Sequence, residues 1–199
     1  MFWDKVSGVY DLAETVYNGK VYRKLGEKTA GEIERNDTVL ECACGTGAIT
    51  RKIAPECRQL VATDLSVKML RQTARKCRKY SNVKIRYADI TKLKYHDNRF
   101  DKVIAGNVIH LLEDPYAALR ELERVCRPGG KIIIPTYINA SDSVNKRTVR
   151  FLEVLGLDFK RQFDRRSYQT FFKNAGYGDA EYYVIDGRMP CMVAVITKR

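Results

Sequence analysis

One short segment combines an acidic residue, small residues and glycines in an order that can hold a nucleotide-like ligand. A β-branched run ends at Glu41 and Cys42, and a helical pattern starts at residue 48. Glycine has no Cβ, so the loop between them can turn tightly and let a ligand approach the backbone. The free N–H groups at a helix start favour the same ligand. The loop consists of Ala43, Cys44, Gly45, Thr46 and Gly47.

The spacing of glycines and acids narrows the choice of ligand. A dinucleotide-binding loop has the pattern G-x-G-x-x-G, whereas Thr50 stands in the third glycine's place here, and no phosphate-binding G-K-S/T ending is present. The next strand pattern ends at Asp64, whose carboxylate can accept hydrogen bonds from both hydroxyls of a ribose. The following pattern ends in Ala88-Asp89-Ile90, at a place suited to an adenine amino group. These strand ends favour a nucleoside ligand without a pyrophosphate.

The strand ends belong to a regular alternation of strand and helix patterns. Apolar, β-branched runs occupy residues 38–42, 60–64, 83–89, 100–105 and 131–137, and the stretches between them are long enough for crossover helices. Runs at 180–185 and 191–197 are joined by five residues, which suits only an antiparallel hairpin. The sequence predicts an α/β fold with a Rossmann-like, doubly wound seven-stranded sheet, five parallel strands followed by the C-terminal antiparallel hairpin. Its ligand crevice should lie at the carboxyl ends of the strands.

The other stretches are expected to complete a single domain over residues 1–199. Residues 1–35 carry a helical pattern through Val21, Leu25 and Ile33 and are predicted to form an N-terminal helical lid or flank. Residues 139–166 interrupt the alternation after the fifth strand. They are a candidate insertion that caps the substrate, and a merely structural helix fits the same pattern equally well.

Composition and charge limit the class of protein. The chain has no signal-peptide pattern at its start and no apolar run of about 18 residues, so a cytoplasmic protein without a membrane span is expected. Its six scattered cysteines are expected to be free thiols, and their spacing predicts no metal site. The net charge of +12 favours anionic partners. The densest basic cluster lies in a predicted amphipathic helix between Ser66 and Tyr80, for which a solvated face is the simpler interpretation.

Taken together, the motifs resemble those of the class I S-adenosylmethionine-dependent methyltransferases, in particular the small-molecule branch of ubiquinone and menaquinone biosynthesis. The resemblance rests on Glu41-x-Ala43-x-Gly45-x-Gly47, on Asp64 and on Ala88-Asp89-Ile90. Its most specific part is the run Leu-Arg-Glu-Leu-Glu-Arg-Val-Cys-Arg-Pro-Gly-Gly over residues 119–130, which precedes an apolar strand. The resemblance implies an enzyme that uses S-adenosyl-L-methionine and releases S-adenosyl-L-homocysteine.

The resemblance also implies roles for individual residues. Residues 44–47 would hold the methionine part of the cofactor, Asp64 the ribose, and Asp89 the adenine edge. Asn107 would lie near the methionine amino group, and Tyr10 would belong to a lid over the methyl donor. The predicted cofactor residues are Tyr10, Glu41, Cys42, Ala43, Cys44, Gly45, Thr46, Gly47, Asp64, Leu65, Met69, Ala88, Asp89, Ile90 and Asn107.

One position departs from the commonest form of the family motif. Ala43 stands where the first glycine is usual, and its methyl group is tolerated if the backbone φ angle is negative. Of the cysteines that flank it, Cys42 is expected to lie buried in the strand and Cys44 to line the turn.

The acceptor and the catalytic groups are less defined. In-line methyl transfer needs alignment and exclusion of water, and it needs a base only where the nucleophile must lose a proton. His110, just after the fourth strand, is the candidate base because imidazole titrates near neutral pH, with a hydrogen-bonded structural histidine as the alternative. Tyr10, Tyr17 and Tyr137 are candidates for lining the acceptor pocket.

A small-molecule acceptor is favoured over RNA or another nucleic acid. The segment Asn107-Val108-Ile109-His110 stands where a nucleic-acid amine methylase has a Pro-Pro-aromatic run. The Pro-Cys pair that a cytosine methylase needs occurs only as Pro190-Cys191, in the predicted hairpin. A nucleic-acid methyltransferase and a cofactor-binding protein without turnover remain as alternatives, and the sequence does not indicate an oligomeric state.

Overall fold

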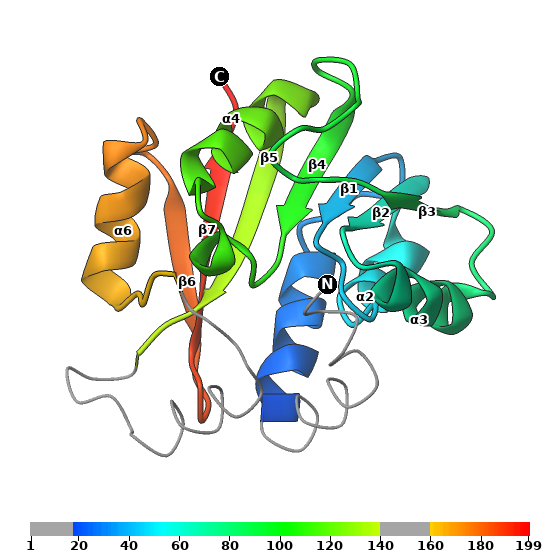
Figure 1. Cartoon of the computed structure of the whole chain (residues 1–199), viewed down its shortest axis with the longest axis horizontal. Coiled ribbons are helices and arrows are strands. Elements are labelled where there is room, and N and C mark those ends of the chain that lie inside the picture. Colours follow the sequence, from blue (N-terminus) through cyan, green and yellow to red (C-terminus); the bar gives the residue numbers. More distant parts are fainter. Residues whose placement is uncertain (1–17, 140–159) are drawn as a thin grey trace.

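The computed structural model of the chain describes residues 18–139 and 160–199, and its centre is a seven-stranded sheet (Figure 1). The strand order is β3-β2-β1-β4-β5-β7-β6. The first five strands run parallel, and β7 pairs antiparallel with both β5 and β6, so the predicted fold class is confirmed. The strands are β1 (Thr38–Cys42), β2 (Gln59–Asp64), β3 (Val83–Tyr87), β4 (Phe100–Ala105), β5 (Cys126–Tyr137), β6 (Glu181–Ile185) and β7 (Cys191–Thr197).

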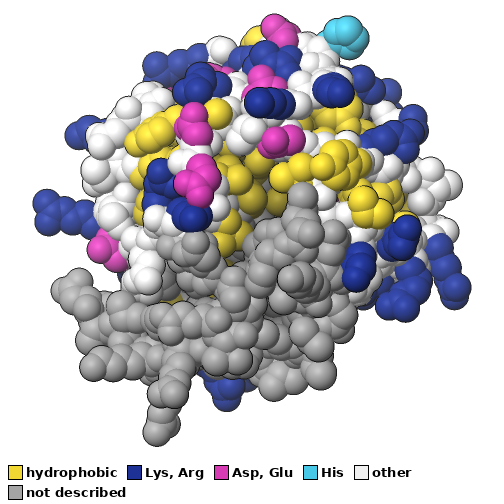
Figure 2. Space-filling view, viewed as in Figure 1, with side chains coloured by type: hydrophobic (Ala, Val, Ile, Leu, Met, Phe, Trp, Pro, Cys, Tyr) yellow, Lys and Arg dark blue, Asp and Glu magenta, His cyan; other side chains and the backbone are white. Residues whose placement is uncertain are grey.

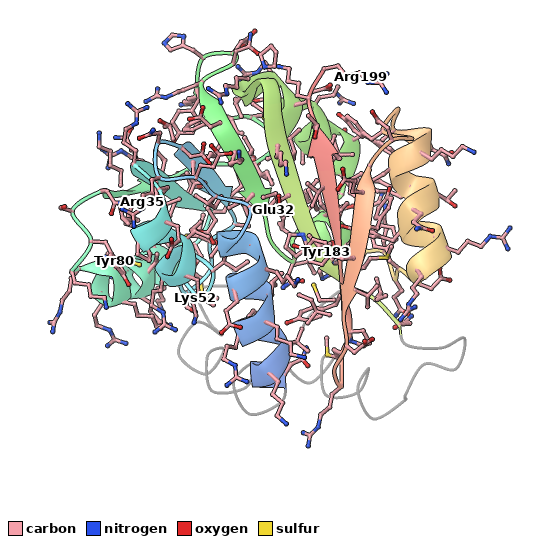
Figure 3. All side chains as sticks on the ribbon, turned by 180° about the vertical axis from the view of Figure 1, so that it is seen from behind. Glu32, Arg35, Lys52, Tyr80, Tyr183 and Arg199 are labelled. Atoms are coloured by element: carbon pink, nitrogen blue, oxygen red, sulfur yellow. The ribbon has the colours of Figure 1, made fainter. Side chains whose placement is uncertain are left out.

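Helices cover both faces of the sheet. A helix over residues 18–30, α2 and α3 lie on one face, which Figure 3 shows from the front, and α4 and α6 lie on the other. Side chains along β2 point alternately to the two faces of the sheet, and both faces are buried. Leu60 and Ala62 pack on the first face and Val61 packs on the second. The other helices of the described residues are α2 (Thr50–Ile53), η1 (Ala54–Glu56), α3 (Val67–Cys77), η2 (Ile109–Leu111), α4 (Pro115–Val125) and α6 (Arg165–Asn174).

Side-chain caps fix where the longer helices begin. The Ser66 hydroxyl accepts a hydrogen bond from the Met69 amide at the start of α3, and Asp114 accepts one from the Ala117 amide at the start of α4. At α6, Asp164 and Ser167 form a reciprocal capping box. Each such cap stabilises a helix by about 1 kcal/mol. The starts of α3 and α4 both lie at the edge of the sheet where the parallel strands end.

The segment between β3 and β4 differs from its predicted crossover helix. Residues 88–99 contain turns and no helix. Carbonyl oxygens that would accept backbone hydrogen bonds in a helix accept them here from Arg124 of α4. Its guanidinium donates to the carbonyl oxygens of Leu93 at 2.8 Å and Tyr95 at 2.7 Å. Because these backbone carbonyls have hydrogen-bond partners without a helix, the connection can remain irregular.

Two predicted boundaries also shift at glycines. The helix expected over residues 48–54 is reduced to α2 and η1, because the chain still turns at Gly47, whose amide donates to the Cys44 carbonyl at 2.9 Å. β5 starts five residues earlier than predicted, at Cys126. A Cβ at Gly130 would lie 2.7 Å from the Asp101 carbonyl oxygen, so only glycine allows this close pairing with β4.

The predicted flanking segments are described in part. Val21 and Leu25 are buried against the sheet and Ile33 packs beside them, so this part of residues 1–35 forms a flank. Residues 1–17, and residues 140–159 of the predicted cap, lie outside the described residues. All six cysteines are free and buried. Among the described residues, no helix has the length and apolar character needed to cross a membrane.

Candidate active site

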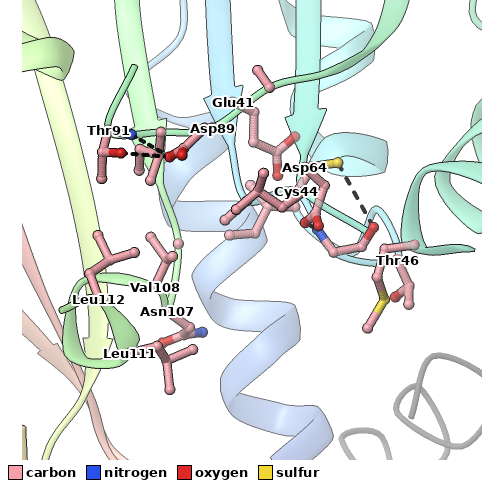
Figure 4. Close-up of a pocket in the computed structure, with 18 of the residues that line it drawn as sticks. Glu41, Cys44, Thr46, Asp64, Asp89, Thr91, Asn107, Val108, Leu111 and Leu112 are labelled. Atoms are coloured by element: carbon pink, nitrogen blue, oxygen red, sulfur yellow. Dashed lines mark hydrogen bonds between the residues drawn. The ribbon is translucent and has the colours of Figure 1, made fainter. Parts of the chain in front are cut away.

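A cavity of about 750 Å³ lies at the carboxyl ends of the parallel strands (Figure 4). It takes its polar wall from the ends of β1 and β2 and the segment after β3, and its apolar wall from η2 and the start of α4. Predicted cofactor residues that line this cavity are Glu41, Ala43, Cys44, Gly45, Thr46, Asp64, Leu65, Met69, Ala88, Asp89, Ile90 and Asn107.

The loop after β1 reverses direction through three left-handed residues. Ala43, Gly45 and Gly47 have φ angles of 53°, 53° and 84°. The condition for tolerating the Ala43 methyl group without strain, a negative φ angle, is therefore not met, because the chain turns as soon as β1 ends. A non-glycine residue in the left-handed region costs about 1 kcal/mol.

The two glycines of this loop have different functions. A Cβ at Gly45 would meet nothing within 4 Å, so its backbone is open to a ligand in the cavity. A Cβ at Gly47 would lie 3.0 Å from Cγ2 of Thr73, and Gly47 is not among the lining residues. Gly47 therefore allows α3 to approach the loop, while Gly45 serves the cavity.

Asp64, at the end of β2, is held by backbone amides on both oxygens. Oδ2 accepts a hydrogen bond from the Gly45 amide at 2.9 Å, and Oδ1 accepts one from the Ser66 amide at 2.8 Å. These bonds tie the first loop to the start of α3 and orient the carboxylate at the cavity wall. Each carboxylate oxygen can accept a further hydrogen bond, so Asp64 can still bind a pair of ligand hydroxyls.

Asp89, which follows β3, is fixed in a similar way. Its Oδ1 accepts hydrogen bonds from the amide and the hydroxyl of Thr91, both at 2.8 Å. This turn leaves the other carboxylate oxygen on the cavity wall. Figure 4 shows Asp89 and Asp64 on opposite sides of Glu41.

Glu41 is the most deeply buried acid of the site. Its side chain lines the cavity, yet the residue is only 2% exposed, and Oε2 has no hydrogen-bond partner among the described residues. Burial raises the pKa of Glu41 to about 8; the nearby charge of Asp64 acts in the same direction, and Thr50 opposes it. An orphaned buried carboxyl in a cavity is suited to a cationic or hydrogen-donating ligand group.

The two thiols beside the loop are inert in this setting. Cys42 is fully buried in β1 and is not among the lining residues, whereas Cys44 lines the cavity, as expected for the strand and the turn. Burial raises the pKa of Cys42 to about 12 and holds the pKa of Cys44 well above its usual value. Reactive cysteines need a lowered pKa, so neither thiol fits a nucleophilic role.

The structure does not bring His110 into the cavity. Its neighbours Val108 and Leu111 line the wall, but His110 is 3% exposed and is not among the lining residues. Burial lowers the pKa of His110 to about 3. An imidazole with this pKa is a weak base at neutral pH, which favours the structural alternative for this residue.

The opposite wall of the cavity is apolar. It includes Val108, Leu111 and Leu112 from the segment after β4 and Ala117 from α4, with Glu113 and Asp114 exposed at the rim. The backbone of Asn107 has a φ angle of 52°, and its amide donates to the Pro135 carbonyl oxygen at 2.8 Å, which aims the following residues at the cavity. This wall can hold an apolar acceptor and exclude water from it.

Sequence reasoning missed several lining residues. Tyr22 reaches the cavity from the helix over residues 18–30, and its ring meets that of Tyr137 edge to face at 6.1 Å. No local signal distinguishes Tyr22 from the other tyrosines. Thr91 could have been found, because a threonine two residues after an aspartate is typical of a side-chain-capped turn. The predicted Tyr10 and Tyr17 lie outside the described residues.

Comparison with known proteins agrees with this geometry. Residues 40–134 match the family model described as a methyltransferase domain. The chain is 33% identical to a demethylmenaquinone methyltransferase from Corynebacterium urealyticum, over 68% of this chain and 57% of the relative. It is 34% identical to a ubiquinone/menaquinone biosynthesis C-methyltransferase from Bdellovibrio bacteriovorus, over 66% and 58%. The chain thus spans less than two thirds of the length of these relatives.

Solved structures support the same fold. A S-adenosylmethionine-dependent methyltransferase from Aquifex aeolicus has a TM-score of 0.69 at 18% identity, with 98% of both chains covered. A phosphoethanolamine N-methyltransferase from Haemonchus contortus, crystallised with S-adenosyl-L-methionine, has a TM-score of 0.70 at 15% identity, over 86% of this chain and 51% of that one.

The sheet has the Rossmann-like fold of these solved methyltransferases. Residues 40–134 match the model of the methyltransferase domain, a class of enzyme that uses S-adenosyl-L-methionine, and the relatives are named for menaquinone and ubiquinone biosynthesis.

The lining residues fit the cofactor of this class. S-adenosyl-L-methionine carries a sulfonium, an ammonium and two ribose hydroxyls. The cavity offers the unpartnered Oε2 of Glu41, the carboxylate of Asp64 and the space beside Gly45 that a side chain would fill. Asp64 would hold the ribose, and residues 44–46 and Glu41 would hold the methionine part. Carboxylates next to cationic groups in a partly dry cavity form strong charge-assisted hydrogen bonds.

Proposed function

We propose that this chain is a single-domain enzyme that transfers a methyl group from S-adenosyl-L-methionine to a small aromatic acceptor of the quinol type. The observation that carries the proposal is the two-sided cavity, in which three acids of the strand ends face an apolar wall. The names of the relatives support a quinol, because demethylmenaquinone is a flat, apolar ring with hydroxyl groups in its reduced form.

The cofactor supplies an electrophilic methyl group on a positively charged sulfur. The protein's part is to align an acceptor carbon with that methyl and to keep water away from it. As the carbon–methyl bond forms, the sulfur–methyl bond breaks to leave S-adenosyl-L-homocysteine, and the proton of the ring carbon is then lost to solvent. Asp64 and Asp89, fixed by their own hydrogen bonds, set the position of the nucleoside, and Leu111 and Leu112 provide a surface for the acceptor ring. We assign His110 a structural role beneath this surface.

Two measurements test the proposal in sequence. Calorimetry should detect binding of S-adenosyl-L-methionine to the wild type, and absence of binding would overturn the whole assignment. A water-soluble, short-tailed demethylmenaquinol should then give S-adenosyl-L-homocysteine and a ring-methylated product. Cofactor binding without product from this quinol or a wider acceptor panel would indicate a binding protein. Product from RNA instead would indicate the nucleic-acid alternative.

A further inference from the structure

A continuous stretch of the chain beside the cavity carries positive charge alone. Residues 65–88 contain eight lysines and arginines and no aspartate or glutamate. This stretch comprises α3 and β3, and β3 is the edge strand of the sheet. Figure 2 shows Lys and Arg side chains along the lower right margin of the molecule, where α3 lies in Figure 1.

The outward face of α3 holds these charges away from the core. Met69, Leu70 and Thr73 are buried against the sheet, whereas Arg71 and Arg75 are exposed. Neither arginine forms an ion pair with a carboxylate of the described residues. On β3, Lys84 and Arg86 are also exposed. The exposed charges of these four side chains attract an extended anionic partner.

Exposed apolar side chains lie at the same edge of the sheet as the cavity, and two of them, Val67 and Tyr87, belong to the basic stretch itself. The exposed large hydrophobic residues of the described part are Val67, at 47%, Tyr87, at 60%, and Tyr116, at 40%. Each neighbours a cavity-lining residue in the chain, because Leu65 and Met69, Ala88, and Ala117 line the cavity. Strand ends and helix starts share one edge of a parallel sheet, so all three lie at the edge where the cavity opens.

The combination of these features distinguishes between anionic partners. An extended basic surface with tyrosine and aliphatic side chains is typical of a protein that sits at the interface of an anionic bilayer. A single-stranded RNA channel would need a row of free aromatic rings for base stacking. Within this stretch, however, the ring of Tyr80 is covered by the Lys79 ammonium at 5.0 Å, which leaves Tyr87 as its exposed ring.

We infer that the surface of α3 and β3 docks this protein on an anionic lipid bilayer, with the cavity mouth next to the lipid. The inference rests on the proposed function in one respect, since a quinol with a long isoprenoid tail resides in the lipid phase and would enter the cavity from there. The apolar residues Val67 and Tyr87 would enter the interface, and Arg71 and Arg75 would contact lipid phosphates.

The test is co-sedimentation of the full chain with vesicles. The wild type should bind vesicles of phosphatidylcholine with about one third phosphatidylglycerol and not vesicles of phosphatidylcholine alone, and high salt should weaken binding. Arg71→Glu/Arg75→Glu should lower the partition coefficient at least about tenfold. The matched control, Arg166→Glu/Lys173→Glu on α6, lowers the net charge equally at exposed helical positions and should retain binding within about twofold.

Several outcomes would overturn the inference. The first is that the wild type does not bind anionic vesicles. The second is that vesicle binding weakens equally in the two double variants. The third is that the protein binds RNA through Arg71 and Arg75 and does not bind vesicles. Thermal unfolding and the affinity for S-adenosyl-L-methionine should be unchanged in both variants, which separates docking from misfolding. Methylation of the water-soluble quinol needs no vesicle. If this methylation failed, the proposed function would be wrong. If it succeeded while the protein did not bind vesicles, only the docking inference would be wrong.

Discussion

The two walls of the cavity are built in different ways. The cofactor wall consists of acids and glycine at strand ends. Two of its acids are fixed by hydrogen bonds to nearby residues: the amides of Gly45 and Ser66 hold Asp64, and Thr91 holds Asp89. The acceptor wall consists of apolar side chains on η2 and α4 with no such bonds between them. Hydrogen bonds therefore set the positions of the acids on the cofactor wall, and apolar packing sets the positions of the side chains on the acceptor wall. Changes on the first wall should therefore affect the cofactor, and changes on the second the acceptor.

The largest effect is expected at Asp64. Replacement by alanine removes the carboxylate that would bind the ribose and also releases the Gly45 amide. We expect Asp64→Ala to weaken binding of S-adenosyl-L-methionine about 100-fold, measured by calorimetry, since hydrogen bonds to a charged group contribute about 1.5–3 kcal/mol. Asp179→Ala, which removes an exposed carboxylate paired with Arg199, is the control and should bind like the wild type. An affinity within threefold of wild type for Asp64→Ala would contradict the cofactor wall.

On the acceptor wall, Leu111→Ala should raise the KM for the quinol about tenfold, because a truncated apolar side chain in a pocket costs about 1–3 kcal/mol of acceptor binding. The affinity for S-adenosyl-L-methionine should stay within about twofold. Leu111→Met, which nearly conserves volume, is the matched control and should restore most of the KM. If cofactor affinity and quinol KM changed together, the two walls would not be separate.

Glu41 links the cofactor wall to pH. Its carboxyl is protonated below a pKa of about 8, and a cationic ligand group beside it favours the ionised form, so binding should release a proton. The wild-type affinity for S-adenosyl-L-methionine should therefore rise between about pH 6 and 7.5, below the range in which the α-amino group of the ligand titrates. Glu41→Gln should bind with little dependence on pH over that interval. If the affinities of the wild type and of Glu41→Gln changed with pH in the same way, Glu41 would not face a cationic group of S-adenosyl-L-methionine.

The same raised pKa has a consequence for stability without ligand. A carboxyl whose pKa is higher in the folded state contributes stability that is present below its unfolded value of about 4.5 and is lost as the pH rises through about 8. The melting temperature of the wild type should therefore fall between about pH 5 and 8 relative to that of Glu41→Gln.

The smallest effect is expected at Ala43. With a φ angle of 53°, alanine is strained there, and glycine relieves the strain at some cost in unfolded-state entropy. Ala43→Gly should raise the melting temperature by about 2–4 °C, which corresponds to about 1 kcal/mol for a chain of this size. Ala74→Gly at an exposed position inside α3 makes the same chemical change without positive φ and should lower it by a similar amount. If both variants shifted the melting temperature in the same direction, the backbone at Ala43 would not be strained.

Prediction from sequence succeeded where the signal is local. The strand at residues 38–42 and the strand that ends at Asp64 each follow from a few neighbouring residues, because alternation acts over short distances. It failed where distant residues decide. The helix expected between β3 and β4 is absent since Arg124, more than twenty residues later, bonds the carbonyls of Leu93 and Tyr95. His110 is a base candidate by sequence, and only its burial lowers its pKa.

The sequence by itself determined the succession of the seven strands and the loop from Glu41 to Gly47, because backbone preference and hydrophobic period are properties of neighbouring residues. The tertiary structure decided the φ angle of Ala43, the division of labour between Gly45 and Gly47, the entry of Tyr22 into the cavity and the apolar wall opposite Glu41. These depend on which surfaces meet when the sheet is covered on both faces, and packing at such contacts joins residues that no local pattern connects.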